Sequence, residues 1–189
     1  LAQITSRVLV GLAPILEQER PDCVLVHGDT TTTFAAALAA FYSKVPVGHV
    51  EAGLRSGSLD FPYPEEGNRL LASRITNWHF SPTAGARDNL LREGISQDKI
   101  VVTGNTVIDA LTQAASWPPG GEAQRLLAQA QGRRILLMEA HRRESWGQPL
   151  EDICQAVSQL VDEFSELEVF FSVHPNPKVQ GTVERILGD

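Results

Sequence analysis

The chain has 189 residues, of which 42% are hydrophobic and 21% charged, so it can bury a core and is not a disordered segment. Its formal charge of −7 and pI near 5.2 argue against sequence-independent binding to nucleic acid, which needs a basic surface. No apolar run is long enough to cross a membrane, and no charged-then-apolar leader opens the sequence.

Cysteine usage indicates a reducing compartment. The two cysteines, Cys23 and Cys154, each lie inside an apolar stretch, as small core residues do. We therefore expect a reduced, cytoplasmic protein, with neither a disulfide nor a metal site built on these thiols.

The first elements set a pattern of helix, strand and helix. Apolar residues at helical spacing predict a helix over residues 2–18. The apolar run from Cys23 to Val26 predicts a strand buried on both faces, which stops where Gly28 and Asp29 turn the chain. Hydroxyls of the run from Thr30 to Thr33 can cap the next helix, expected over residues 32–42.

The same alternation continues to the end of the chain. A loop rich in glycine, serine and proline runs to Pro64, and Gly94 is placed to close a helix in the left-handed conformation. The remaining strands are expected at residues 45–50, 78–80, 100–103, 134–138 and 168–173, with helices at 65–75, 84–92, up to about 115, 122–131, 150–164 and 179–187.

Alternating strands and helices predict an α/β fold with parallel sheets. The Pro- and Gly-rich run 117–121 interrupts the pattern, so we expect two Rossmann-like lobes. The first lobe would cover residues 1–116, a connecting segment 117–132, and the start of the second lobe 133–189. Both lobes are expected to be incomplete, because the chain opens inside a helix and two strands do not make a covered sheet.

Polar side chains follow the predicted strands at the points where these end. They are Asp29, Glu51, Asn105, His141 and His174, and Glu65 starts the helix after the long loop. In open α/β sheets this edge is where ligands bind. Carboxylates beside a histidine and arginines suit proton transfer next to a phosphate leaving group. No His and carboxylate pair has the helical spacing of a metal site, so the sequence gives little support for metal binding.

Each of these residues also has a purely structural interpretation. Asp29 could be only a helix cap. Glu65 and Glu66 could be first-turn partners of the helix dipole, with Arg69 forming an i to i+4 ion pair. His49 and His79 lie within strands, where packing is the simpler interpretation than ligand binding.

Six motifs in order resemble the bacterial non-hydrolysing UDP-N-acetylglucosamine 2-epimerases, over residues 21–188. They are His27-Gly-Asp-Thr-Thr-Thr-Thr33, His49-Val-Glu-Ala-Gly-Leu-Arg55, Pro62-Tyr-Pro-Glu-Glu66 followed by Asn68-Arg69, Phe80-Ser-Pro-Thr83, Thr103-Gly-Asn-Thr-Val-Ile-Asp109 and His141-Arg-Arg-Glu144. The resemblance implies a fold of glycosyltransferase-B type, a homodimer, and reversible epimerisation at C2 of the sugar to UDP-N-acetylmannosamine, for surface polysaccharide precursors. The reaction would pass through elimination and re-addition of UDP by way of 2-acetamidoglucal. The resemblance therefore implies that neither a metal nor a redox cofactor is needed.

The resemblance also implies roles for individual residues. Asp29, Glu51 and Glu65 correspond to catalytic carboxylates, and His141 to the histidine beside UDP. Substrate-binding positions are Arg69, Asn105, Arg142 and His174, and which carboxylate is the base stays open.

The resemblance further implies that the chain is the middle of the enzyme and that the isolated segment is inactive or very weak. The family's Gly-Thr-Arg-Pro-Glu and Ser-Gly-Gly loops are not among these residues. Two alternatives stay open: a sugar transferase of the same fold, and a non-catalytic nucleotide-sugar-binding module.

Overall fold

The computed structural model describes residues 1–140 and 145–188. Contacts divide the chain into two compact units, unit 1 over residues 1–115 and unit 2 over residues 116–189. Unit 1 contains a four-stranded sheet and unit 2 a two-stranded sheet, and every strand pair in both is parallel. The α/β class with parallel sheets, predicted from alternating strands and helices, is therefore confirmed.

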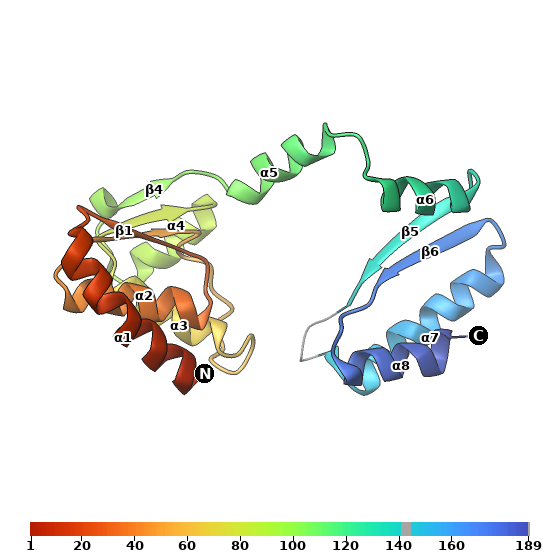
Figure 1. The fold of residues 1–189 in the computed structure, drawn as a ribbon, viewed down its shortest axis with the longest axis horizontal. Coiled ribbons are helices and arrows are strands. Elements are labelled where there is room, and N and C mark those ends of the chain that lie inside the picture. The colour runs from red at the N-terminus through yellow and green to blue at the C-terminus, as the bar shows by residue number, and fades with distance from the viewer. Residues whose placement is uncertain (141–144, 189) are drawn as a thin grey trace. The chain divides into compact units, whose positions relative to one another are not determined.

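Unit 1 alternates helices and strands from its first residues (Figure 1). Its strands pair in the order β1-β2-β3-β4, which is also their order along the chain. The elements are α1 (Ala2–Glu19), β1 (Val24–His27), α2 (Thr31–Tyr42), β2 (Val47–Val50), α3 (Glu65–Ile75), β3 (Trp78–Ser81), α4 (Ala84–Arg92), the 3₁₀ turn η1 (Gln97–Lys99), β4 (Ile100–Val102) and α5 (Thr106–Ala115).

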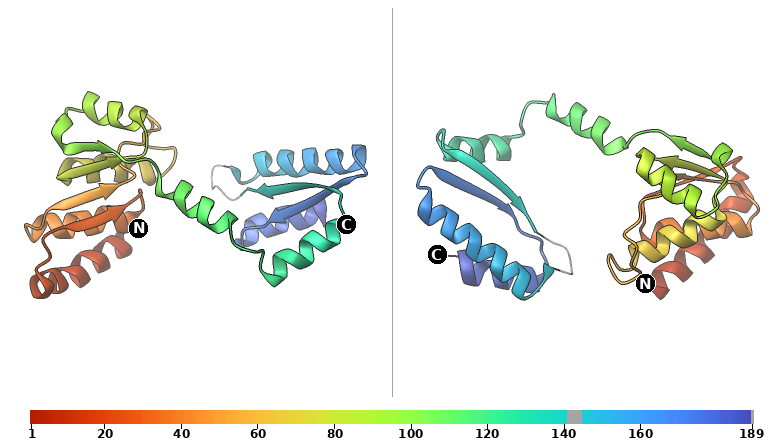
Figure 2. Two further views of the ribbon diagram at one scale, coloured as in Figure 1. Left: turned by 90° about the horizontal axis from the view of Figure 1, so that it is seen from above. Right: turned by 180° about the vertical axis from the view of Figure 1, so that it is seen from behind.

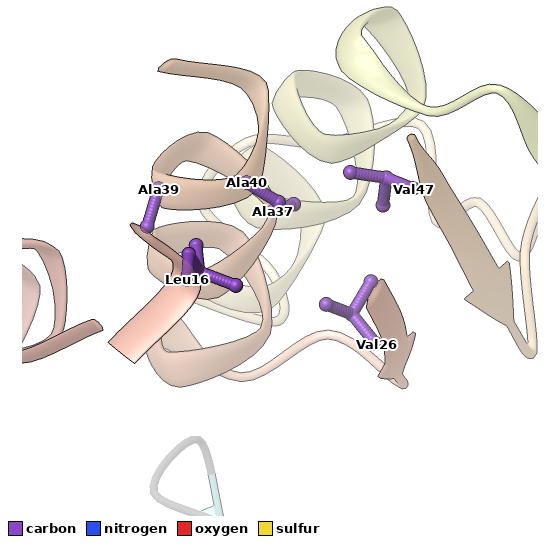
Figure 3. Close-up of a cluster of buried hydrophobic side chains, with 6 residues drawn as sticks. All are labelled: Leu16, Val26, Ala37, Ala39, Ala40 and Val47. Atoms are coloured by element: carbon purple, nitrogen blue, oxygen red, sulfur yellow. The ribbon is translucent and has the colours of Figure 1, made fainter. Parts of the chain in front are cut away.

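Helices cover one face of the unit 1 sheet. Right-handed crossovers between strands that pair in sequence order place the connecting helices on the same face, and α1, α2 and α3 lie together on that side (Figures 1 and 2). Alanines on α2 let it approach the strands closely. Figure 3 shows the resulting core cluster of Leu16, Val26, Ala37, Ala39, Ala40 and Val47.

The expectation that the first strand is buried on both faces is wrong. Val26 is 5% exposed, whereas its neighbour Leu25 is 66% exposed. Successive side chains of a strand point to opposite faces, and among the described residues the helices of unit 1 cover the face that Val26 occupies. Leu25 lies instead on the other face, over Gly48, where a Cβ atom at position 48 would come within 2.6 Å of the Leu25 side chain.

Local capping follows the predictions made from sequence. The Thr30 hydroxyl accepts a hydrogen bond from the Thr33 amide, 3.2 Å away, so Thr30 is the N-cap of α2. Gly94, just after α4, has φ +84°, the left-handed conformation expected of a residue that closes a helix.

Unit 2 has its own core. Its elements are α6 (Gly121–Ala130), β5 (Arg134–Glu139), α7 (Gln148–Glu163), β6 (Leu167–Ser172) and α8 (Pro177–Leu187). The buried cluster of Leu150, Cys154, Val179 and Val183 joins α7 to α8, and Phe171 of β6 packs against it. Both cysteines are free thiols. None of the helices within the described residues is long and apolar enough to cross a membrane.

Candidate active site

Three of the predicted residues meet at one edge of the unit 1 sheet. Asp29 follows β1, Glu51 follows β2 and Asn105 follows β4. Because the strands are parallel, their carboxyl ends share one edge, which is where α/β sheets place ligand sites.

Asp29 stands on a turn that is fixed from several sides. Gly28 before it has φ +75°, a conformation that side chains disfavour. The Arg69 guanidinium donates to the Asp29 carboxylate, with Nη2 2.6 Å from Oδ2, and the Asn68 amide donates to the Asp29 carbonyl at 2.9 Å. The interpretation of Asp29 as a helix cap is wrong, because Thr30 fills that position.

Glu51 has a strained backbone and two partners. Its φ of +69° lies in the left-handed region, which costs a non-glycine residue about 1–3 kcal/mol and clusters at functional sites. The carboxylate oxygen Oε2 lies 3.4 Å from His27 Nε2, and Oε1 accepts a hydrogen bond of 3.3 Å from the Asn105 amide. The structure thus brings Glu51 and Asn105 together as predicted for one site, and adds His27.

Glu66 lies beneath the site and holds Arg69. The residue is 2% exposed; Oε2 accepts from Arg69 Nη1 at 3.1 Å and Oε1 from the Gly57 amide at 3.1 Å. Burial raises the pKa of Glu66, but hydrogen bonds from the Ser56 and Gly57 amides and the charge of Arg69 outweigh it and lower the pKa. The i to i+4 pair expected between Glu65 and Arg69 is wrong; the pair that forms is Glu66 with Arg69, at i to i+3.

Glu65 differs from its neighbour. It is half-buried at the start of α3, and among the described residues its carboxylate has no hydrogen-bond or ion-pair partner. A carboxylate so placed can turn toward a ligand without first breaking a contact.

The remaining predicted residues belong to unit 2. His174 lies in the exposed turn after β6, where its Nδ1 accepts a hydrogen bond from the Asn176 amide at 3.1 Å. His141 and Arg142 lie outside the described residues.

Comparison with known proteins places the chain. The model of the family described as UDP-N-acetylglucosamine 2-epimerase matches residues 1–189. The chain belongs to this family. The UDP-N-acetylglucosamine 2-epimerase of Escherichia coli K12 is 47% identical over 194 residues, which cover 100% of the chain but 52% of that enzyme. The chain therefore spans about half the length of this curated relative.

Solved structures agree with the family assignment. The S. aureus MnaA–UDP co-structure is 44% identical with a TM-score of 0.92, covering 100% of this chain and 51% of that one. The Neisseria meningitidis UDP-GlcNAc 2-epimerase bound to UDP-GlcNAc is 43% identical with a TM-score of 0.91, covering 98% and 51%. A trehalose-phosphate synthase from Burkholderia vietnamiensis, 18% identical with a TM-score of 0.55, shares the fold alone. These likenesses confirm the predicted fold class of glycosyltransferase-B type.

Sequence reasoning missed three residues of this polar cluster. His27, Glu66 and Asn68 all stand in the six motifs, but the sequence alone does not show that they contact Glu51, Arg69 and Asp29. In the sequence these residues are marked only by being close to Asp29, Glu65 and Arg69. Closeness in sequence does not show which of two neighbouring side chains turns inward.

Two further features concern metal binding and the cavity near the site. Within residues 1–140 and 145–188, no group of three or more His, Cys, Asp and Glu side chains is arranged to hold a metal ion. A cavity of about 350 Å³ lies between the 57–59 loop, α3 and α4, and neither Asp29 nor Glu51 lines it. Its wall includes Arg55, which is held by a bidentate ion pair with Glu93 at 2.6 and 2.9 Å.

Proposed function

We propose that the protein carrying this chain interconverts UDP-N-acetylglucosamine and UDP-N-acetylmannosamine, without hydrolysing the nucleotide sugar. The observation that carries the proposal is the meeting of Asp29 and Glu51 at one sheet edge, each held by polar side chains, in a member of the 2-epimerase family. The relatives bound to UDP and to UDP-GlcNAc support the same class of ligand.

The chemistry explains why carboxylates are needed. No carbonyl adjoins C2, so its proton is not acidic enough for simple deprotonation. Instead a base removes the C2 proton while the C1–O bond breaks, the electron pair leaves with UDP, and a double bond forms between C1 and C2. In the return step an acid delivers a proton to the opposite face of C2, and a UDP oxygen attacks C1. The reaction thus needs acid and base groups around the sugar.

We assign Asp29, Glu51 and Glu65 as the carboxylates that exchange these protons. Asp29 keeps its Oδ1 without a hydrogen bond to any described residue while Oδ2 is bound by Arg69. Arg69 donates to both Asp29 and Glu66, so its part is to orient Asp29. Asn105 orients Glu51 in the same way.

We assign the nucleotide to unit 2 residues. His174 follows β6, at the carboxyl edge of the second parallel sheet, and His141 and Arg142 come after β5 in the sequence. Imidazole and guanidinium groups suit a diphosphate, whose charge increases as the C1–O bond breaks. No metal ion or cofactor takes part in these steps.

The proposal concerns a protein of the length of its relatives. Because the chain spans about half of them, we expect the 189-residue chain alone to be inactive or very weak. We further propose that the longer protein works as a homodimer in the cytoplasm and feeds surface polysaccharide synthesis.

Solvent exchange tests the proposal. Incubating the full-length protein with UDP-N-acetylglucosamine in deuterated water should give the mannosamine epimer with deuterium at C2, detected by proton NMR. Transfer of the sugar to an acceptor without deuterium at C2 would indicate a glycosyltransferase instead. Binding by calorimetry with no conversion would indicate a non-catalytic binding module.

A further inference from the structure

Both peptide groups that flank Asp29 are held by buried side chains. The carbonyl of Gly28 belongs to the peptide before Asp29 and lies 2.7 Å from His49 Nε2. The carbonyl of Asp29 belongs to the peptide after it and accepts from the Asn68 amide at 2.9 Å. With Arg69 on the carboxylate, the residue is held before, after and at its side chain.

His49 is built into the sheet below this turn. It is 1% exposed on β2 and lies directly beside Val26 of β1 in the parallel register. A carbonyl oxygen can only accept, so the hydrogen bond requires that Nε2 carry the proton. Burial is the main cause of a lowered pKa for His49, so the ring is neutral near pH 7 and donates from this one nitrogen.

The neighbouring strand offers a matched comparison. His79 is the register partner of His49 on β3 and is fully buried on the same face. Among the described residues neither of its ring nitrogens has a hydrogen-bond partner. Burial on this face therefore does not by itself bring an imidazole to the turn, and the His49 contact is specific to its position.

We propose that His49 is a positioning residue for Asp29, acting through the Gly28 carbonyl. The bond fixes the plane of the Gly28–Asp29 peptide while Gly28 stays at φ +75°. That plane sets the direction in which the Asp29 side chain leaves the backbone, and so its alignment with Arg69. The inference rests on the proposed function only in taking Asp29 as a reacting group.

The test compares His49→Leu, His49→Gln and His79→Leu in the full-length protein. Loss of the donor in His49→Leu should lower kcat at least 10-fold with KM changed less than threefold, because misalignment of a reacting group costs turnover more than binding. His49→Gln retains an N–H donor and should restore kcat to within threefold of wild type. His79→Leu should leave kcat and KM unchanged. Equal losses in His49→Leu and His49→Gln, or an equal loss in His79→Leu, would overturn the proposal.

A second measurement works in the 189-residue chain and needs no activity. The Gly28 amide donates to the Val50 carbonyl at 3.0 Å, so its hydrogen exchange reports whether the turn is held. His49→Leu should accelerate exchange at Gly28 at least 10-fold, and His79→Leu should not. If the full-length wild type shows no deuterium at C2, the proposed function fails and this exchange alone decides the role of His49. Unchanged exchange at Gly28 in His49→Leu would refute positioning whatever the reaction.

Discussion

The turn after β1 and the first turn of α3 each carry a carboxylate assigned to catalysis, and the two are held very differently. Asp29 is bound by Arg69 at its side chain and by His49 and Asn68 at its flanking peptides. Glu65 has no such contact among the described residues, whereas its neighbour Glu66 is buried and paired.

The difference shows that two neighbouring glutamates in the first turn of α3 have different roles. Glu66 turns inward and accepts hydrogen bonds from the Gly57 amide and from Arg69. It thereby holds the guanidinium that binds Asp29. Glu65 turns elsewhere and is left available for a ligand. Two identical residues, adjacent in sequence, therefore have opposite expected effects: Glu66 on stability and Glu65 on turnover.

The sharpest test substitutes two of the three carboxylates proposed to be catalytic, Asp29 and Glu65, by their amides in the full-length protein. Asp29→Asn should lower turnover by about 10²- to 10⁴-fold, the usual contribution of a general acid or base, and so should Glu65→Gln. The measurement is deuterium incorporation at C2, with UDP binding checked by calorimetry. Glu122→Gln, on an exposed ion pair of α6, is the control and should retain full turnover. Wild-type turnover in Asp29→Asn or Glu65→Gln would remove that residue from the reaction.

The next largest effect separates Glu65 from Glu66 by stability. Glu66→Gln should cost about 2–3 kcal/mol, because it removes a buried charged acceptor from Arg69 and Gly57. Glu65→Gln should change stability by less than about 0.5 kcal/mol, as expected of a side chain without partners. The free energy of unfolding of unit 1 alone can be measured from the hydrogen exchange of the slowest β2 amides in each variant. Equal losses in both variants would mean that the two carboxylates are not divided as described.

The smallest expected effect is the loss of stability of unit 1 in acid, which depends on the buried His79 of β3. Burial is the main cause that lowers the pKa of His79 to about 4 from 6.5, with the charges of His49 and Arg55 adding to it. The folded state binds fewer protons than the unfolded state, so stability is full above pH 6.5 and is lost as the pH falls toward 4. Between pH 7 and pH 5 the loss should be about 2 kcal/mol from His79.

The same exchange experiment at both pH values measures this loss, and His79→Leu is the matched variant. Glu66 does not contribute in this window, because its lowered pKa makes its contribution disappear only below its ordinary value of 4.5. A pH dependence as large in His79→Leu as in wild type would show that another group is responsible.

The sequence by itself determined the elements and the edge on which the polar residues gather. Helical and strand periodicities placed α3 and α4 at residues 65–75 and 84–92, and the hydroxyl run predicted the Thr30 cap. These features depend on local contacts, which the nearest residues in sequence decide. The position of Asp29, Glu51 and Asn105 after parallel strands then followed from topology alone.

Only the tertiary structure decided which face of the first sheet is covered and which polar groups bind one another. Leu25 is exposed because helices cover one face of the sheet, and no periodicity in a four-residue strand distinguishes one covered face from two. Arg69 pairs with Glu66 and Asp29 and not with Glu65. The reason is tertiary: the Gly57 amide holds the Glu66 carboxylate, and the turn after β1 brings Asp29 to the guanidinium. His49 was expected only to pack; its bond to Gly28 forms because β1 and β2 pair in a register that places its ring beneath the turn that carries Asp29.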